Sequence, residues 1–388
     1  MSGKSAMAVN FCHTASVVFR LRRPPAGDLA AAAERVAQLV GSAISDGVVP
    51  GAVLAAGLGD RTLLECVAGD AQRDQAARRP MSAGTLFDLA SLTKVVATTP
   101  CILLLSAAGT LALDDPVRRY LPGFAGQGKD LVTIRQLLTH MSGLPEYRPY
   151  SEFLAEAGQA RAAFLAEPLV AAPGSTCVYS DIGFMVAGAL AEAVGGCSLD
   201  DLASALVFAP LRMAGARFRP PASLAGQIAS TEPVAGVART GVVHDENAAL
   251  LGGVAGHAGL FATAADMSAY AAAWTGPEGE LPDGWLPACL RAEALRCQTG
   301  GLGGRRGLGW GLRGDRWDNM GPGWPESGAG HTGFTGTSLS VDPRTGLWAV
   351  LLTNAVHFGR GRPGNPVVNL RKQLHTAVAA ALLQPDVG

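Results

Sequence analysis

Apolar residues follow a helical period near the start of the chain and then a strand period. From about 28 to 46 they recur every three or four residues, and Asp28 is placed to cap the first turn, so this segment is predicted to be an amphipathic helix. The runs 51–57 and 62–68 are short and apolar and are separated at Gly59-Asp60, which is typical of a tight turn. They are predicted to be two strands of a hairpin.

Strand patterns return near the end of the chain. Residues 338–341 and 348–353 flank a turn at 342–346, and an amphipathic helix is predicted for about 367–383. Between about 82 and 260 the pattern is one of helices separated by Gly and Pro loops. Strands from both ends therefore predict one α/β lobe, with the helical insert as a second lobe and a ligand cleft between them.

Domain boundaries follow from this pattern. Residues 1–27 are predicted to form an N-terminal arm, 28–85 and 262–388 the α/β lobe, and 86–261 the mainly helical lobe. A chain of this length can hold both lobes in a single domain.

One stretch has almost the length of a membrane span. Residues 95–113 are nineteen residues without a charge, but Thr98, Thr99, Ser106 and Thr110 interrupt the apolar run. This pattern favours a buried helix over a span, so no membrane partner is predicted.

Bulk composition excludes several classes of protein. The 388-residue chain is 48% hydrophobic and 16% charged, which indicates a globular protein. Its 31 Lys and Arg balance 32 Asp and Glu, and the short basic run Arg20-Leu21-Arg22-Arg23 is predicted to be a solvated arm. No nucleic-acid partner is therefore expected.

The cysteines and the first residues bear on the cellular compartment. The seven cysteines are scattered and form no C-x-x-C pair, which indicates reduced thiols and neither a disulfide framework nor a zinc site. The first residues lack the pattern of a secretory signal, because polar residues interrupt their apolar stretch and a basic run follows it. A cytoplasmic location is expected.

The candidate nucleophile is Ser91 of Ser91-Leu92-Thr93-Lys94. Lys94 is one of only four lysines in the chain, and positions i and i+3 of a helix share a face, so its amine can reach the Ser91 hydroxyl. A serine hydroxyl is a weak nucleophile until a base takes its proton, and a lysine can be that base if burial and cationic neighbours depress its pKa. The predicted loop-to-helix junction at Ser91 also offers N–H groups to an oxyanion.

Two further segments complete a candidate constellation. Tyr179-Ser180-Asp181 precedes an Ala-rich helix, and a tyrosine near a cationic lysine can become a phenolate or pass a proton. His331-Thr332-Gly333 stands just before the strand predicted at 338–341. Glycine lets a substrate approach the backbone closely, and an N–H just after it can complete an oxyanion hole with that of Ser91.

In this order the three segments resemble the serine β-lactamase and penicillin-binding-protein family, whose signature is S-x-x-K, then S-x-N or Y-x-N, then K-T-G. The tyrosine is typical of the class C branch, and phrases at 138–145, 243–248 and 252–261 are similar to those of class C-like hydrolases and esterases. The resemblance covers roughly residues 28 to 384. It implies a two-lobe β-lactamase-like fold of the α/β class. In that fold an antiparallel sheet is flanked by N- and C-terminal helices, and the active site lies in the cleft beside an all-helical lobe.

The resemblance also implies roles for individual residues. Ser91 would be acylated, and Lys94 and Tyr179 would share the proton transfer. The N–H groups of Ser91 and Phe334 would hold the oxyanion. Its other oxyanion and substrate-binding positions are Asp181, His331, Thr332 and Gly333. No cofactor and no metal ion is implied.

Two positions depart from the family's pattern. Asp181 stands in place of the Asn of Y-x-N, and His331 in place of the Lys of K-T-G. In antibiotic-hydrolysing members these residues help hold the carboxylate and amide of the β-lactam, so an Asp and His pair is expected to recognise an anionic β-lactam less well. A His331 charged at mildly acidic pH would restore part of that anion binding. The departures favour an esterase, amidase or acyltransferase.

Other polar groups of the chain are possible rival sites. His244-Asp245-Glu246 with His257 suggests a metal site at first sight, but the spacing fits no standard zinc pattern. A Ser-His-Asp triad would want a G-x-S-x-G turn, which no serine of this chain has. His140 is expected to satisfy the last carbonyls of a helix, and Cys177 to pack without reacting.

The predicted function is acyl transfer through Ser91 from an ester or amide of a small molecule to water, an amine or an alcohol. Richness in alanine, arginine and glycine is typical of a high-GC genome, where relatives of this kind often act on natural products, so a transacylase of antibiotic biosynthesis is included. Two alternatives stay open: a D,D-peptidase or β-lactamase, and a non-catalytic sensor or scaffold that keeps the fold. The acyl donor, its acceptor and the oligomeric state are also left open.

Overall fold

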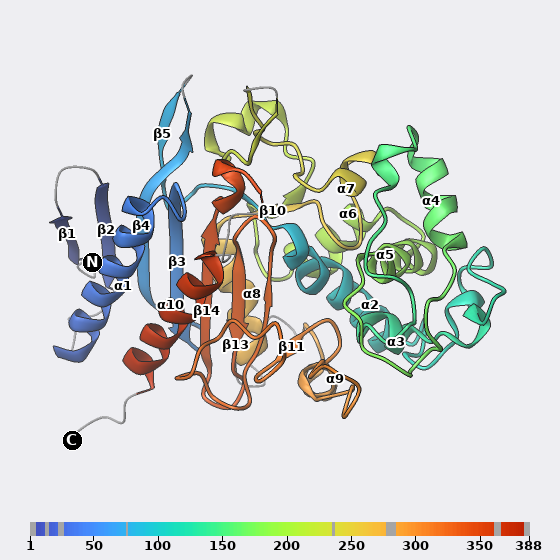
Figure 1. Cartoon of the computed structure of the whole chain (residues 1–388). Helices are drawn as coiled ribbons and strands as arrows, with labels where there is room; N and C mark the ends of the chain where they lie inside the picture. The colour runs from blue at the N-terminus through green and yellow to red at the C-terminus, as the bar shows by residue number, and fades with distance from the viewer. Residues whose placement is uncertain are drawn as a thin grey trace.

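The computed structural model describes residues 5–11, 15–21, 27–74, 77–234, 237–276, 285–360 and 366–383. The strands of its main sheet are β1 (Ser5–Phe11), β2 (Ala15–Leu21), β3 (Gly51–Leu58), β4 (Arg61–Arg73), β5 (Arg78–Pro80), β11 (Gly311–Leu312), β12 (Ala329–Thr332), β13 (Ser338–Val341) and β14 (Leu347–Thr353). They pair in the order β1-β2-β4-β3-β14-β13-β12-β11, with β5 on β4, and every pairing is antiparallel (Figure 1). Strands from both ends of the chain thus build one sheet, as predicted.

The central strand β14 is buried on both faces, because successive side chains of a strand point to opposite sides. Leu347 and Leu351 pack in a core with α1 (Gly27–Ser45) and α10 (Pro366–Leu382). The alternate residues Trp348, Val350 and Leu352 face a larger core that α8 (Ala264–Thr275) and the helical lobe share. The two terminal helices therefore cover one face of the sheet, and the helical lobe lies beyond the other.

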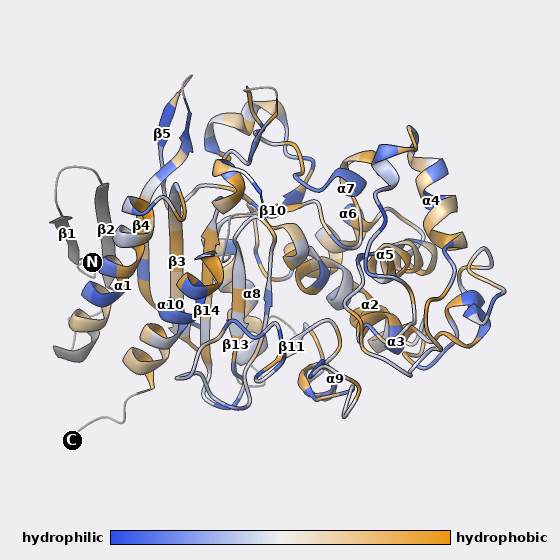
Figure 2. Cartoon of the chain, in the orientation of Figure 1, coloured by the Kyte–Doolittle hydropathy of each residue, from blue (hydrophilic) through white to orange (hydrophobic). Residues whose placement is uncertain are grey.

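The helical lobe carries the middle of the chain. Its helices are α2 (Thr99–Ala107), α3 (Ile134–Leu138), α4 (Ala157–Ala166), α5 (Asp181–Gly195), α6 (Leu199–Ala203) and α7 (Glu246–Leu250). The ribbon of α5 is largely apolar, as is that of β3 in the sheet (Figure 2). The α5 helix begins where the Ser180 hydroxyl accepts the N–H of Gly183, the usual way to satisfy a free donor in a first turn.

Shorter elements join the two lobes. They are η1, a 3-10 turn (Ala90–Leu92), η2, a π-helix (Lys94–Thr98), the small sheet of β6 (Phe87–Asp88), β10 (Leu260–Ala262) and β7 (Arg217–Phe218), the pair β8 (Pro233–Val234) and β9 (Val237–Ala238), and α9 (Ala288–Leu295). The small sheet lies beside the segment that carries Ser91, since Leu89 N–H donates to the carbonyl of Leu260.

The uncharged stretch predicted as a buried helix lies in η2 and α2. The window Ala90–Ala107 is long and apolar enough to compare with a membrane span, but 78% of it is buried inside the protein. Among the described residues one other candidate exists, if Asp181–Gly195 and the bent continuation Leu199–Phe208 are counted as one span. The burial of Ala90–Ala107 is typical of a helix in a protein core.

The segment predicted as an N-terminal arm contains two strands. β2 extends the sheet beside β4, with Val18 opposite Val67, and β1 pairs with β2. Arg20, expected in a solvated basic run, lies in β2 opposite Glu65, while Arg22 and Arg23 lie outside the described residues. The sheet therefore reaches further toward the N-terminus than the predicted boundary, because β4 offers a free edge to a second strand.

Candidate active site

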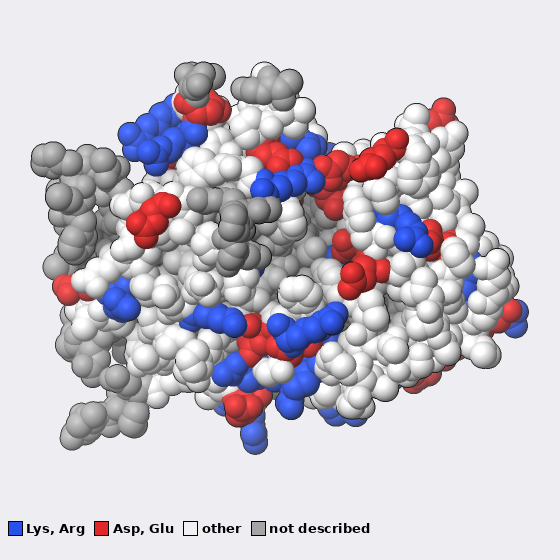
Figure 3. Space-filling view, in the orientation of Figure 1, with Lys and Arg blue, Asp and Glu red and all other residues white. Residues whose placement is uncertain are grey.

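Ser91 borders a cavity of about 540 Å³ between the sheet and the helical lobe. Tyr179 lines it from the helical lobe, Arg306 from the loop before β11, and residues 330–334 from β12 and the turn after it. The face drawn in Figure 3 is hollowed near its middle, and side chains of opposite charge lie beside each other around the hollow. Three segments that are far apart in the sequence thus meet at one cavity.

The backbone just before Ser91 is held in an uncommon conformation. Ala90 has a φ of 46°, the left-handed region that disfavours residues with a side chain. One oxygen of the buried Asp88 carboxylate accepts the N–H of Ala90 at 2.9 Å, and the other accepts the N–H of His244 at 2.6 Å. Burial raises the pKa of Asp88. These two hydrogen bonds fix the turn that presents Ser91 to the cavity.

Lys94 lies directly behind the nucleophile. Its fully buried ammonium donates to the Ser91 hydroxyl at 2.9 Å and to the carbonyl of His257 at 3.3 Å. The segment that carries this carbonyl can approach because a Cβ on Gly256 would lie 2.0 Å from the carbonyl oxygen of Phe184. Only glycine fits there, which places the His257 carbonyl on Lys94.

The third partner of Lys94 is Asp181. The carboxylate lies 2.7 Å from the ammonium, so the residue expected to meet the substrate instead forms an ion pair inside the site. Burial acts to lower the pKa of Lys94, but Asp181 and Tyr179 outweigh it and raise that pKa above its ordinary value. The condition under which Lys94 could act as the base, a depressed pKa, is therefore not met, because this carboxylate opposes the effect of burial.

Tyr179 lies among charged and aromatic groups. The Lys94 Nζ is 4.9 Å from the centre of its ring, and the Arg306 Cζ is 5.6 Å from it. The rings of His140 and His331 lie at 4.6 Å and 6.0 Å, centre to centre. Two cations and two imidazoles therefore surround the one tyrosine that lines the cavity.

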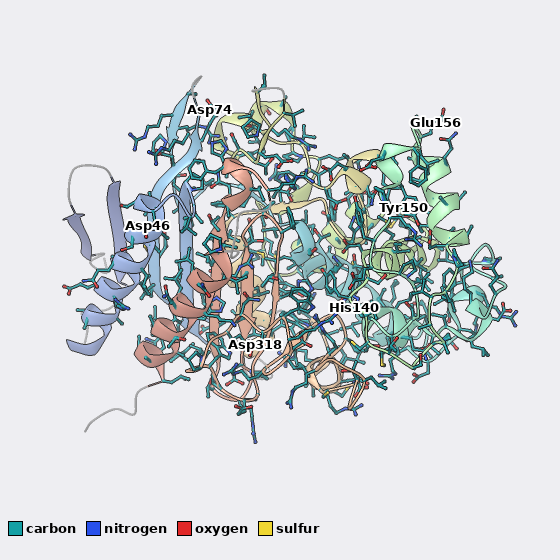
Figure 4. All side chains as sticks on the ribbon, viewed as in Figure 1. Asp46, Asp74, His140, Tyr150, Glu156 and Asp318 are labelled. Carbon is teal, nitrogen blue, oxygen red and sulfur yellow. The ribbon has the colours of Figure 1, made fainter. Side chains whose placement is uncertain are left out.

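His140, labelled near the middle of the molecule in Figure 4, holds the loop that carries Tyr179. Its ring Nδ1 accepts the N–H of Ser180 at 3.0 Å, and its own backbone has a φ of 59°. Burial, with Arg306 and Lys94 nearby, lowers the pKa of His140 well below its ordinary value. The ring of His140 was expected to donate a hydrogen bond to the last carbonyls of a helix. This prediction was wrong, because the ring nitrogen accepts a hydrogen bond from Ser180.

His331 and Thr332 precede the strand predicted at 338–341, which is β13, but they also form the end of β12, a strand that was not predicted. The four-residue strand has too little apolar alternation to stand out in the sequence. The His331 ring contacts the carbonyl of Thr332 at 3.0 Å through Nδ1. Burial, Lys94 and Arg306 lower the pKa of His331 well below its usual range. The expectation of a charged His331 at mildly acidic pH is therefore contradicted.

The turn after β12 packs on the segment that precedes Ser91. A Cβ on Gly333 would lie 2.4 Å from the carbonyl oxygen of Leu89 and 2.1 Å from the Thr337 hydroxyl. Thr337 donates that hydroxyl to the Leu89 carbonyl at 3.1 Å, and Thr335 donates its own to the Asp88 carbonyl at 2.8 Å. The two segments whose N–H groups are expected to hold an oxyanion are thus joined side by side.

Phe334 closes this turn on the solvent side. Its side chain is 61% exposed and stacks on the His244 ring at 5.7 Å. It lines the cavity together with Trp317, another exposed aromatic residue. The apolar rim of the cavity therefore comes from two loops.

Sequence reasoning missed Arg371, which holds the same turn from behind. Its buried guanidinium donates to the carbonyls of Gly333 at 2.7 Å, Thr337 at 3.0 Å and Gly336 at 3.3 Å. Burial lowers the pKa of Arg371 to about 10. Nothing in the sequence signals this role, since Arg371 lies in the amphipathic last helix, where arginine is ordinarily a surface residue.

The rival sites have partners of their own. His244 Nε2 lies 3.3 Å from Glu232, and His257 Nε2 lies 2.9 Å from Asp245. Within the described part of the chain, no group of three or more His, Cys, Asp or Glu could hold a metal ion. The buried Cys177 thiol lies 3.6 Å from the Thr139 carbonyl, and burial raises its pKa, so it packs and is not activated.

Comparison with known proteins identifies the class that this fold and site define. The model of the Beta-lactamase family matches residues 32–372, and the chain belongs to this family. The family consists of serine hydrolases that act through an acyl-enzyme. The predicted resemblance and the β-lactamase-like fold are thereby confirmed.

Individual relatives carry different activities. A putative D-alanyl-D-alanine carboxypeptidase of Escherichia coli (strain K12) is 32% identical over 312 residues, which cover 71% of this chain and 70% of that protein. The structure of EstCE1, a hydrolase with promiscuous acyltransferase activity, aligns at a TM-score of 0.70 with 26% identity, over 90% of this chain and 99% of its own. A class C β-lactamase shares the fold at a TM-score of 0.70 with 20% identity, over 90% and 99% of the two chains.

Proposed function

We propose that this protein is a serine hydrolase or acyltransferase that acts on an ester or amide of a small molecule. The observation that carries the proposal is the 2.9 Å contact between Lys94 Nζ and Ser91 Oγ at the wall of the cavity, beside Tyr179. The activity of EstCE1, hydrolysis with promiscuous acyl transfer, supports it.

In the proposed acylation Tyr179, and not Lys94, takes the proton. Because the pKa of Lys94 is raised, its ammonium keeps its proton at neutral pH and donates to Ser91. The Ser91 proton passes to the Tyr179 phenolate as Oγ forms a bond to the substrate carbonyl carbon. The carbonyl oxygen gains the negative charge, for which the Ser91 and Phe334 N–H groups are the proposed donors.

Collapse of this intermediate breaks the bond to the leaving group. The electron pair goes to the leaving alkoxide or amine, which receives the proton from Tyr179. The acyl group stays on Ser91 until water, an alcohol or an amine attacks the same carbon and Tyr179 takes the proton of the attacker. Return of that proton to Ser91 Oγ releases the acid, ester or amide product and restores the enzyme.

The charges of the site support an ester over an anionic β-lactam. His331 carries no charge near neutral pH, and Asp181 is engaged by Lys94. Arg306 is paired with Asp315 at 3.0 Å, and Arg360 at the rim is paired with Glu232 at 2.5 Å. Arg371, which also lines the cavity, donates to three backbone carbonyls. These cations are already engaged within the protein, so a neutral acyl donor fits better than an anionic one.

A second candidate is a D,D-carboxypeptidase. It is favoured by the name of the Escherichia coli relative, which shares 32% identity with this chain. Such an enzyme uses the same acylation of serine, but its substrate is a peptide that ends in D-alanyl-D-alanine.

Steady-state kinetics with three substrates test the proposal. We expect turnover of p-nitrophenyl acetate, with kcat/KM for nitrocefin and for D-alanine release from an acyl-D-alanyl-D-alanine peptide lower by about a hundredfold or more. Tyr179→Phe is expected to reduce ester turnover by roughly a thousandfold, whereas Tyr120→Phe, outside the cavity, is the matched control. Preference for the peptide over the ester would favour the second candidate. Ester turnover by Tyr179→Phe equal to that of the wild-type protein would contradict the acid/base role of Tyr179.

A further inference from the structure

The loop before β11 brings a second cation to the acid/base tyrosine. Arg306 lines the cavity with Ser91 and Tyr179, and its guanidinium carbon lies 5.6 Å from the centre of the Tyr179 ring. Its side chain is buried, and its backbone N–H donates to the Thr299 hydroxyl at 2.9 Å. A buried guanidinium over an aromatic ring costs free energy to desolvate and is retained only where other contacts compensate.

Asp315 is the compensating contact. Its buried carboxylate accepts from Arg306 Nη2 at 3.0 Å and from the N–H groups of Trp317 at 2.9 Å and Arg305 at 2.8 Å. These bonds fix both partners of the ion pair, so the guanidinium has one position with respect to the ring. Arg306 lies in the Gly-rich segment before β11, and Asp315 lies in the loop after β11.

Three other titratable groups lie close to the Tyr179 ring. Lys94 is the second cation and is paired with Asp181 at 2.7 Å, as Arg306 is with Asp315 at 3.0 Å. His140 and His331 are the remaining titratable neighbours, and burial lowers the pKa of both well below the usual range, so both rings are neutral near pH 7. Arg306 is therefore, besides Lys94, a positive charge that lies close to the ring.

We propose that Arg306 is a positioning residue for acyl transfer: held by Asp315, its guanidinium stabilises the negative charge of the Tyr179 oxygen in the phenolate form. This inference rests on the proposed function of Tyr179. A cation near an oxygen favours its anionic form, and the effect is large where water is excluded. Arg306 thus acts through Tyr179 and does not need to touch the substrate.

Two substitutions of opposite sign test this proposal. Arg306→Gln removes the cation, and we expect tyrosinate absorbance of Tyr179 to appear at a pH higher by about one unit, with kcat/KM for p-nitrophenyl acetate lower by roughly tenfold below that pH. Asp315→Asn removes the compensating anion, and we expect tyrosinate absorbance of Tyr179 to appear at a lower pH than in the wild-type protein. A merely structural role would make both substitutions reduce activity at every pH.

A rescue experiment separates charge from packing. The His331 ring is 6.0 Å from that of Tyr179, so His331→Lys places a new cation beside it. Added to Arg306→Gln, it is expected to return the tyrosinate signal toward the wild-type pH. If Arg306→Gln does not fold, Asp315→Asn alone tests the proposal. Tyrosinate absorbance of Tyr179 that appears at an unchanged or higher pH in Asp315→Asn would overturn it.

The readout keeps this proposal separate from the proposed function. Tyrosinate absorbance is measured as the difference between each protein and the same protein with Tyr179→Phe, and it needs no turnover. Absence of any shift in Arg306→Gln, in an enzyme that still forms an acyl-enzyme, would overturn the role of Arg306 alone. Absence of an acyl-enzyme with the expected shifts would overturn the proposed function and leave the role of Arg306 supported.

Discussion

The Lys94 ammonium and the Asp181 carboxylate lie 2.7 Å apart in the buried part of the site. The contact explains why a fully buried lysine keeps its charge, since burial alone would lower the pKa of Lys94. It also gives the first residue of α5 a function inside the site. In the proposed mechanism the lysine of this S-x-x-K motif is an electrostatic partner of Ser91 and Tyr179, and the tyrosine transfers the proton.

Substitution of Asp181 is the direct test of this ion pair. In Asp181→Asn the carboxylate no longer raises the pKa of Lys94, and Tyr179 is left to oppose the effect of burial without it. Lys94 is expected to lose its proton at lower pH, so the alkaline limb of kcat/KM for p-nitrophenyl acetate moves down by about one pH unit or more. Asp130→Asn, which breaks the exposed pair with Arg118, is the matched control. An alkaline limb that stays in place would refute the role of the pair.

The turn after β12 gives a second prediction. Gly333→Ala introduces a Cβ that would lie 2.4 Å from the Leu89 carbonyl oxygen and 2.1 Å from the Thr337 hydroxyl. The turn must move away from the Ser91 segment, and loss of one oxyanion donor is expected to reduce kcat by roughly a hundredfold, with KM changed much less. Gly158→Ala in α4, where no atom lies within 4 Å of the new Cβ, is expected to leave both unchanged. A wild-type kcat in Gly333→Ala would rule out this packing as a requirement.

Buried histidine predicts the pH dependence of stability. Burial and the nearby Arg371 lower the pKa of His375 from 6.5 to about 4. Between pH 6.5 and 4 the unfolded state therefore binds a proton at His375 that the folded state does not bind. The contribution of His375 to the free energy of unfolding is fully present above about pH 6.5. It is lost as the pH decreases toward 4, by up to about 3 kcal/mol.

Urea unfolding at pH 7 and pH 5 measures this loss. His375→Gln removes the titrating group from its place beside Ser338 and Ser340, so the variant should lose less stability between the two pH values than the parent. His140 and His331 are present in both proteins, and their lowered pKa values act in the same direction, so they cancel in the comparison. The same loss in both proteins would show that His375 does not contribute.

Much of the fold follows from local pattern. The helices predicted at 28–46 and 367–383 and the strands predicted at 51–57 and 348–353 correspond to α1, α10, β3 and β14. Their apolar periods are long and regular, because each packs on a large core. The short β12 was missed, since its four residues show too little apolar alternation. The hairpin of β1 and β2 was also missed, since it joins the sheet through pairing of β2 with β4, about forty residues further along the chain.

The site divides in the same way. Ser91, Lys94 and Tyr179 could be predicted because motif order brings chemically suited residues together. In the structure Ser91 and Tyr179 line one cavity, and the buried Lys94 contacts Ser91. The pairing of Asp181 with Lys94 could not be predicted, because it depends on how α5 packs against η2. Arg306 and Arg371 carry no local signal, since each acts across the fold on a residue more than thirty positions away.

Intact-mass spectrometry after brief mixing with p-nitrophenyl acetate and an acid quench tests the central claim most directly. The account predicts one added acetyl group on the wild-type protein, located at Ser91 by peptide mapping and absent from Ser91→Ala. An adduct of the same yield in Ser91→Ala, or no adduct on the wild-type protein while the ester is being hydrolysed, would contradict an acyl-enzyme at Ser91.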